Sequence, residues 1–140
     1  MVRPPFHLAI PVRDLGEARR FYKEILGCAE GRSSDRWVDF DFRGHQVVAH
    51  LSPAVIGTVP GNEVDGDAVP ARHFGLVLDP AAFDRMQERL EAAGVDFLIE
   101  PHLRFKGLPG EQRTMFVLDP SGNALEFKSF SDPGRLFKRE

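Results

Sequence analysis

The sequence predicts an α+β fold in which one β-α-β-β-β unit occurs twice. Each half of the chain begins with an apolar strand that carries a histidine near its start, His7 in the first half and His73 in the second. Each of these strands is followed by apolar residues at helical spacing, and each such stretch ends in a glycine, Gly27 or Gly94. A period of about half the chain indicates duplication of one supersecondary unit, and neither copy alone should bury a stable core.

The first half is expected to contain a strand, a helix and a hairpin. Residues 6–12 alternate between apolar and other side chains and predict a strand, and Asp14 is a suitable N-cap for the helix that follows. Residues 37–42 alternate strictly and predict a strand with one solvated face. Residues 45–52 form the next strand after the turn at Arg43 and Gly44, so these two strands are expected to pair as a hairpin.

The segment between the two halves has a different character. Residues 53–71 are rich in proline and glycine, and a loop of this length is uncommon inside a compact domain. We interpret it as a linker, with a lid role for residues 62–67 as a second possibility. The predicted division is a first module at 1–56, a linker or lid at 57–71 and a second module at 72–140, which together form one structural domain.

The second half repeats the order of the first. Asp79 and Pro80 predict the start of a helix that ends at Gly94, because proline is favoured at the first helical position. The other elements expected here are four strands and one loop: strands at 73–78, 95–100, 114–118 and 124–130, and a loop at 101–113. A tight turn at 119–123 joins the last two strands.

Composition excludes several functional classes. The 140 residues suffice for one domain, and the net charge of −3 is spread without the basic stripe that nucleic-acid binding requires. No stretch approaches the roughly 20 apolar residues that span a bilayer, and the amino terminus lacks a signal-peptide pattern. Cys28 is the only cysteine, so no intrachain disulfide can form. We therefore expect a cytoplasmic protein that binds a small molecule and neither nucleic acid nor a membrane.

Three residues are candidate metal ligands. His7 and His73 occupy the same place in the two repeats, and imidazole suits first-row divalent ions. Glu126 lies in the middle of a strand, where a carboxylate is costly to bury unless it is paired or bound to a metal. Lys128 has the same strand parity as Glu126, so a simple ion pair between them is the alternative interpretation of this carboxylate.

The chain resembles the vicinal oxygen chelate superfamily, which includes glyoxalase I, bleomycin-resistance proteins, fosfomycin-resistance enzymes and extradiol dioxygenases. The matching stretches are FHLAIPVRDLGEARRFYKEILG, HFGLVL and MFVLDPSGNALEFKSF. The resemblance implies two βαβββ modules that form an incomplete barrel around a metal site, as in glyoxalase, bleomycin-resistance protein and dihydroxybiphenyl dioxygenase. It also implies that His7, His73 and Glu126 bind one divalent metal ion per chain, and that the protein is a homodimer.

Other residues are candidates for catalysis or substrate binding. His50 lies on the last strand of the first module, where some members of the superfamily place a further ligand. It is a fourth ligand, a catalytic acid or base, or a structural residue, and of these we predict the catalytic role. Arg104 and Gln112 could bind an anionic or polar substrate from the loop at 101–113, whereas Arg113 is better explained as an ordinary solvated residue. His102 is a weaker candidate for lining the site.

Two histidines and one carboxylate form a facial triad that leaves open positions for substrate oxygens. We predict an extradiol-dioxygenase-like oxidation with Fe(II) or Mn(II), because the 12 phenylalanines suit an apolar pocket. The alternative is a glyoxalase I-like lyase or isomerase with Ni(II), Co(II) or Zn(II), which requires a carboxylate base. A third hypothesis, a non-catalytic antibiotic-binding resistance protein, predicts lost ligands, whereas all three ligand positions here hold residues able to bind a metal.

Overall fold

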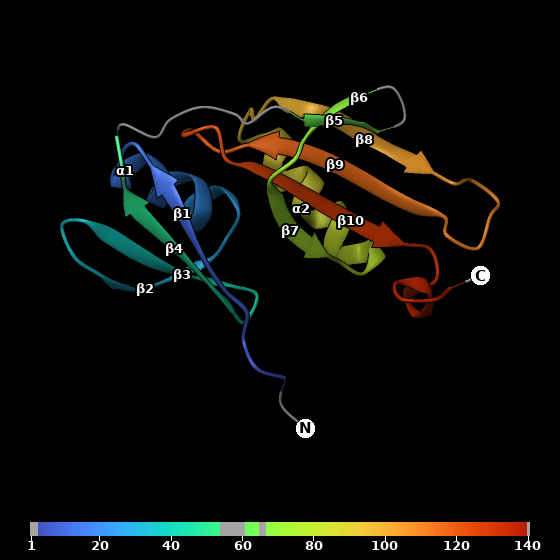
Figure 1. The fold of residues 1–140 in the computed structure, drawn as a ribbon, viewed down its shortest axis with the longest axis horizontal. Coiled ribbons are helices and arrows are strands. Elements are labelled where there is room, and N and C mark those ends of the chain that lie inside the picture. The colour runs from blue at the N-terminus through green and yellow to red at the C-terminus, as the bar shows by residue number, and fades with distance from the viewer. Residues whose placement is uncertain (1–2, 54–60, 65–66, 140) are drawn as a thin grey trace. The chain divides into compact units, whose positions relative to one another are not determined.

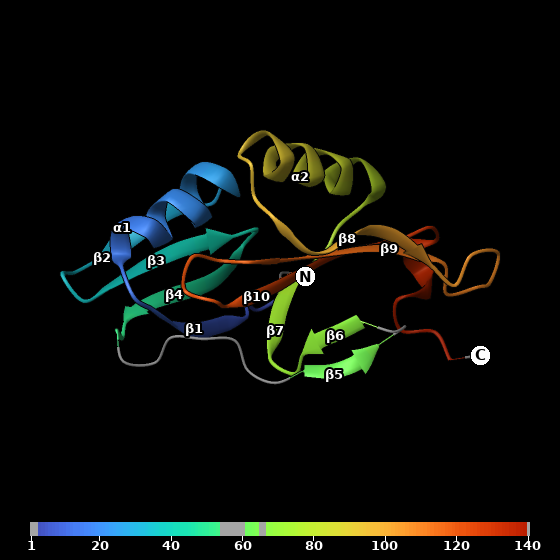
Figure 2. The ribbon, with the colours of Figure 1, turned by 90° about the horizontal axis from the view of Figure 1, so that it is seen from above.

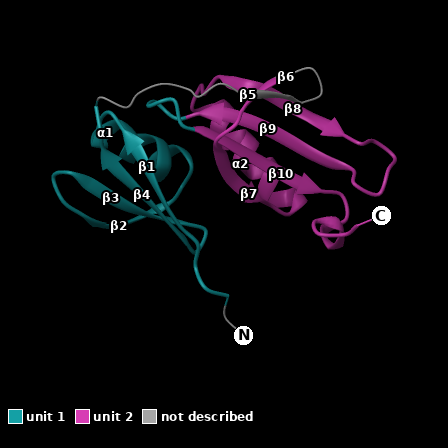
Figure 3. Ribbon diagram, in the orientation of Figure 1, with its two compact units in different colours: residues 1–58, 119–123 teal, residues 59–118, 124–140 magenta. Residues whose placement is uncertain are grey.

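The computed structural model describes residues 3–53, 61–64 and 67–139. The chain divides into two compact units (Figure 3): unit 1 comprises residues 1–58 and 119–123, and unit 2 comprises 59–118 and 124–140. Each unit contains a four-stranded mixed sheet. The predicted α+β class with two β-α-β-β-β modules is therefore confirmed.

Unit 1 is a four-stranded sheet with a helical segment against one face (Figures 1 and 2). Its strands are β1 (His7–Val12), β2 (Ala29–Ser33), β3 (Trp37–Phe42) and β4 (His45–Leu51), in the order β1-β4-β3-β2. Strand β1 runs parallel to β4, and the other pairs are antiparallel. The helical segment comprises α1 (Leu15–Ala18) and the π-helical η1 (Arg19–Ile25). Phe21, Tyr22 and Leu26 are each at most 2% exposed, so they form the core of the unit.

Local sequence explains where this helical segment begins and ends. The Asp14 carboxylate accepts a hydrogen bond from the backbone N–H of Glu17 at 2.7 Å, as an N-cap should. Gly27 adopts a φ of +81°, which ends the helix without the steric penalty that a Cβ would bring. Strand β2 was missing from the sequence prediction, because Ala29–Ser33 has no apolar alternation and pairs only along one edge, with β3.

Unit 2 has the same strand order in its own sheet, with strands β7 (His73–Val77), β8 (Phe97–Arg104), β9 (Gln112–Leu118) and β10 (Ala124–Phe130) arranged β7-β10-β9-β8. Helix α2 (Pro80–Ala92) covers one face of this sheet. A hairpin of β5 (Gly61–Val64) and β6 (Asp67–Pro70) lies on the opposite face (Figure 2). Val69 of this hairpin forms a buried cluster with Ile99 and Phe116 of the sheet. A short 3-10 helix, η2 (Pro133–Arg135), follows β10.

Two segments of unit 2 contain more strand than the sequence predicts. The predicted linker at 57–71 contains the paired strands β5 and β6, whereas residues 54–60 and 65–66 lie outside the described residues. The predicted loop at 101–113 is shorter than expected, because β8 continues to Arg104 and β9 begins at Gln112. Within the described part of the chain, no helix is long and apolar enough to cross a membrane.

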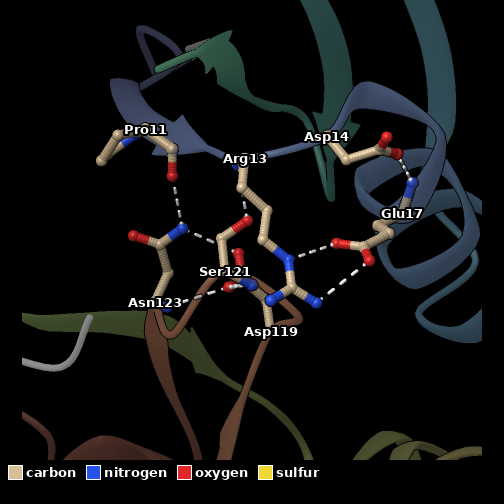
Figure 4. A network of polar contacts seen from close by, with 7 residues as sticks. All are labelled: Pro11, Arg13, Asp14, Glu17, Asp119, Ser121 and Asn123. Atoms are coloured by element: carbon tan, nitrogen blue, oxygen red, sulfur yellow. Dashed lines mark hydrogen bonds and ion pairs between the residues drawn. The ribbon is translucent and has the colours of Figure 1, made fainter. Parts of the chain in front are cut away.

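The turn at residues 119–123 belongs to unit 1, where its polar side chains make specific hydrogen bonds (Figure 4). The Ser121 hydroxyl accepts a bond from the backbone N–H of Arg13 at 2.9 Å, and the Asn123 amide donates to the carbonyl of Pro11 at 2.8 Å. Asp119 caps the turn by accepting from the backbone N–H groups of Ser121 and Asn123. The turn-forming residues thus also act as hydrogen-bonding partners for the end of β1.

Candidate functional site

His73 and Glu126 face the same side of the sheet in unit 2. Strand register pairs Glu126 with Gly75 of β7 and with Phe116 of β9, and His73 precedes Gly75 by two residues. Because side chains alternate along a strand and paired residues share a face, His73, Phe116 and Glu126 lie on one face. Helix α2 covers the other face, so this pair lies on the side that carries the β5–β6 hairpin.

The His73 imidazole is held with one ring nitrogen directed at the Glu126 carboxylate. Its Nδ1 lies 2.8 Å from the carbonyl oxygen of Pro70, and a carbonyl can only accept, so Nδ1 carries a hydrogen. The other nitrogen, Nε2, lies 3.6 Å from Glu126 Oε1, which is longer than an ordinary hydrogen bond. The ring also packs edge-on against Phe116, with centroids 5.1 Å apart. The orientation of His73 is therefore fixed by contacts on two sides.

This spacing suits a shared cation. In the neutral ring Nε2 presents a lone pair to a carboxylate, an arrangement that requires a proton or a metal ion between them. Two donor atoms that each lie about 2.1 Å from one metal ion are typically roughly 3.0–3.5 Å apart, close to the observed separation. The donor pair of His73 and Glu126 thus fits a divalent ion.

Glu126 is 8% exposed and is held by neighbours on both oxygens. Thr114, which is 1% exposed, donates its hydroxyl hydrogen to Glu126 Oε2 at 2.5 Å. Lys128 Nζ lies 3.4 Å from Oε1, which is the ion pair that the shared strand parity allowed. A buried carboxylate requires such partners, and a hydrogen bond to one oxygen leaves the other oxygen directed at His73.

His7 lies in unit 1 on the sheet face opposite the helical segment, and it has its own orienting chain of hydrogen bonds. Its Nδ1 lies 2.7 Å from Gln46 Oε1, and Gln46 Nε2 donates to Asp39 Oδ2 at 3.1 Å. The amide oxygen can only accept, so His7 Nδ1 carries the hydrogen and Nε2 keeps a lone pair. Sequence reasoning missed Gln46 and Asp39. The signal was the register of the edge strand β1 along β4, which sets Gln46 opposite His7.

Strand register also defines the position of His50. In unit 2, the residue two positions after His73 is Gly75, and it pairs with Glu126. In unit 1, the residue two positions after His7 is Ala9, and it pairs with Val48. Val48 is therefore the counterpart of Glu126 in unit 1. His50 is exposed on the same face, two residues further along β4. This register does not support the fourth-ligand interpretation of His50.

The three polar residues expected from the loop at 101–113 occupy different places. Arg113 pairs with Asp84 of helix α2 at 2.6 Å and covers the ring of Phe83, so it lies on the sheet face opposite Glu126. Gln112 is 8% exposed, and among the described residues its Oε1 has no hydrogen-bond partner. The Arg104 guanidinium lies 4.9 Å from the ring centroid of Phe105. Arg104 and Gln112 are paired across β8 and β9, so they share a face with Glu126.

His102 lies in β8 rather than in a loop, and its register partner is Thr114, which binds Glu126. The ring Nδ1 of His102 is 3.0 Å from the carbonyl oxygen of Glu100. Within the described residues, no three His, Cys, Asp or Glu side chains come together at one point. His73 and Glu126 lie close together in unit 2, whereas His7 lies in unit 1.

The duplicated β-α-β-β-β unit, with a histidine at the start of each copy and a buried Glu126, defines a two-module α+β protein with a candidate metal pair. The family model of the Glyoxalase/Bleomycin resistance protein/Dioxygenase superfamily matches residues 5–127, and the chain belongs to this superfamily. A glyoxalase/bleomycin resistance protein/dioxygenase from Alicyclobacillus acidocaldarius is 38% identical, with 96% of each chain covered and a TM-score of 0.80.

Two more distant solved structures share the fold. The fosfomycin resistance protein FosX from Listeria monocytogenes is 19% identical, with 97% of this chain and 100% of that chain covered and a TM-score of 0.72. A glyoxalase/dioxygenase from Nostoc punctiforme is 21% identical, with 93% and 92% covered and a TM-score of 0.67. Among curated proteins, the chain has no significant match.

Proposed function

We propose that the chain is a divalent-metal-dependent enzyme that binds two adjacent oxygens of a small substrate. The proposed ligands are His7, His73 and Glu126. The observation that carries this proposal is the distance of 3.6 Å between His73 Nε2 and Glu126 Oε1. The second nitrogen of the ring is already bonded to the carbonyl of Pro70, and the second oxygen of the carboxylate is already bonded to the hydroxyl of Thr114. Metal-binding histidines characteristically donate their other N–H to a carbonyl or carboxylate in this way.

The reaction that these residues favour is an extradiol-dioxygenase-like oxidation with Fe(II) or Mn(II). A divalent ion at this position would act as a Lewis acid toward the substrate oxygens and would leave positions open for them. A glyoxalase-type reaction requires a carboxylate base, and the counterpart of Glu126 in unit 1 is the apolar Val48. This apolar position supports the dioxygenase-like proposal over the isomerase.

The remaining site residues would bind the substrate and move a proton. Gln112 Oε1, which has no hydrogen-bond partner within the described part of the chain, would accept a substrate hydroxyl hydrogen, and Arg104 lies beside Gln112 on the neighbouring strand. His50, with an exposed imidazole on the same face as Gln46, is proposed as the acid or base. Its function would be proton transfer rather than metal binding.

Metal content is the measurement that tests the proposed ligands. The protein, purified without a metal-chelating tag, is expected to hold close to one divalent ion per chain by elemental mass spectrometry. His7→Ala and Glu126→Gln should each remove it, whereas His102→Ala, a histidine on the same sheet face as Glu126 but outside the ligand set, should retain it. Iron or manganese would lead to catechols and oxygen-uptake assays, and nickel, cobalt or zinc to isomerase assays. A parent protein that stays empty after reconstitution with all five metals would refute the proposal.

Gln46→Leu is expected to weaken metal binding without removing a ligand. The substitution deletes the acceptor that keeps the hydrogen on His7 Nδ1, and loss of such a partner typically costs about 10- to 100-fold in metal affinity. The affinity is measured by zinc titration against a competing chelator. Gln87→Leu on helix α2, where the exposed amide donates a hydrogen bond to Glu91, is the matched control and should leave the affinity unchanged.

A further inference from the structure

Strand β6 packs on the sheet of unit 2 through a buried valine. The β5–β6 hairpin lies on the sheet face that carries His73 and Glu126 (Figure 2). Val69 of β6 is 6% exposed and forms a buried cluster with Ile99 of β8 and Phe116 of β9. The packing of Val69 therefore determines where β6 lies on this face.

The cluster around Val69 is connected to the imidazole of His73 in two ways. Phe116, a member of the cluster, also contacts the His73 ring edge-on, with the ring centroids 5.1 Å apart. Pro70 follows Val69 directly, and its carbonyl oxygen lies 2.8 Å from His73 Nδ1. The hydrogen bond that orients the imidazole therefore depends on the position of β6.

We propose that Val69 is a positioning residue for the metal ligand His73. By packing β6 against the sheet, Val69 holds the Pro70 carbonyl at the place where it accepts the Nδ1 hydrogen. This inference rests on the proposed function, because it concerns a ligand of the same metal site. It goes beyond that function by making metal affinity depend on the β5–β6 hairpin, which lies in the segment predicted as a linker or lid.

The tautomer of His73 explains why the carbonyl matters for metal binding. A neutral imidazole can carry its hydrogen on either nitrogen, and a carbonyl next to Nδ1 selects the form in which Nε2 keeps its lone pair. If the carbonyl moves away, the hydrogen can reside on Nε2, which then cannot bind a metal ion. The edge contact with Phe116 restricts rotation of the ring but does not select the tautomer.

The coupling between β6 and the metal ion must act in both directions. If the packing of Val69 strengthens metal binding, a metal ion bound by His73 stabilises the packing of β6 by the same factor. Local opening of a strand is visible in amide hydrogen exchange, because the opened segment exchanges while the rest of the unit remains folded. Bound metal is therefore expected to slow exchange at the amides of Ala68 and Val69.

A simpler interpretation is that Val69 contributes only to the stability of unit 2. That interpretation predicts that a folded variant of Val69 binds metal with the affinity of the parent protein. It also predicts that local exchange in β6 is the same with and without metal. The two interpretations therefore differ in a metal affinity and in an exchange rate, and neither readout depends on catalytic activity.

The test begins with zinc affinity, titrated against a competing chelator in variants that circular dichroism shows to be folded. Val69→Asn places an amide among apolar side chains and so disfavours the packing of β6. Its zinc affinity should be about 10- to 100-fold weaker, the loss typical when the partner of a metal-binding histidine is removed. Ala68→Asn introduces the same side chain at the adjacent exposed position and should retain the parent affinity. Val69→Ile keeps the apolar contact and should retain most of it.

Hydrogen exchange of the parent protein with and without zinc requires no substitution, so it tests the inference even if Val69→Asn does not fold. Zinc should slow exchange at Ala68 and Val69 but not in η2, a peripheral segment of the same unit. Unchanged exchange in β6, or a folded Val69→Asn with the zinc affinity of the parent, would overturn the inference and leave the proposed metal site intact. A parent protein that binds no zinc would overturn the proposed function and the inference with it.

Discussion

Gly75→Ala is expected to destabilise unit 2 by about 3 kcal/mol or more, at or beyond the upper end of ordinary overpacking effects. Gly75 lies in β7 directly opposite Glu126 of the parallel strand β10. A Cβ on Gly75 would overlap the carbonyl oxygen of Glu126 and would come within 2.6 Å of its carbonyl carbon. These are backbone atoms, so no side-chain rotation can relieve the overlap, and the two strands must separate. Because these strands carry His73 and Glu126, the proposed metal binding should be lost as well.

Chemical denaturation followed by far-ultraviolet circular dichroism measures this effect. Trp37, the single tryptophan, lies in β3 of unit 1, so its fluorescence reports that unit separately. Gly110→Ala is the matched control, because an added Cβ there would meet only the ring of Phe105, at an ordinary contact distance of 3.9 Å. The control should change stability by less than about 0.5 kcal/mol. Equal stabilities of the two variants would show that β7 and β10 do not require the close approach at Gly75.

The fold was predictable from sequence where hydrophobic periodicity was strong. Residues 124–130 were predicted as a strand with the bounds that β10 has, because apolar and polar residues alternate from Leu125 to Lys128 and the segment lies between a clear turn and a mostly polar tail. Strand β2 was missed because its residues are mostly exposed, and an edge strand can be held by backbone hydrogen bonds without an apolar pattern. The extension of β8 was missed because Pro101 suggested a loop. The strand nevertheless contains Pro101, and the register between β8 and β9 is irregular at this place.

Sequence identified the candidate side chains of the site, but it could not predict the contacts that orient them. Strand parity correctly allowed the ion pair of Lys128 with Glu126. The hydrogen bond from His73 to Pro70 depends on the path of the chain just before β7, and no periodicity encodes it. Glu126 lies four residues after its turn glycine, Gly122, whereas His50 lies six after Gly44. The residue four after Gly44 is Val48, and the register of β1 confirms that Val48 occupies the equivalent place.

Asp119→Ala is expected to destabilise unit 1 by about 3–5 kcal/mol, the range found when one partner of a buried charged network is removed. Asp119 is 4% exposed and accepts from the Tyr22 hydroxyl at 2.7 Å, from the backbone N–H groups of Ser121 and Asn123, and from the Asn123 amide. Alanine removes the acceptor of all four hydrogen bonds, and the Asn123 amide keeps its bond to Pro11. Tyr22→Phe removes only one hydrogen bond, so its cost should be smaller, about 1–2 kcal/mol. Comparable losses in the two variants would mean that the turn does not depend on the other three bonds.

The ionisation of Tyr22, the single tyrosine, gives an independent measure of the same network. Burial raises the pKa of Tyr22 well above its usual value of 10.0, and the charge and hydrogen bond of Asp119 raise it further. The folded state therefore binds this proton more tightly than the unfolded chain does. Its contribution to stability is complete below pH 10.0 and is lost as the pH rises toward the pKa of the folded state.

In the parent, tyrosinate absorbance should appear together with alkaline unfolding. In Asp119→Ala, where burial and the neighbouring Cys28 still raise the pKa of Tyr22 but Asp119 no longer does, both should begin at lower pH. A tyrosinate titration with the same onset in both proteins would show that Asp119 does not influence Tyr22.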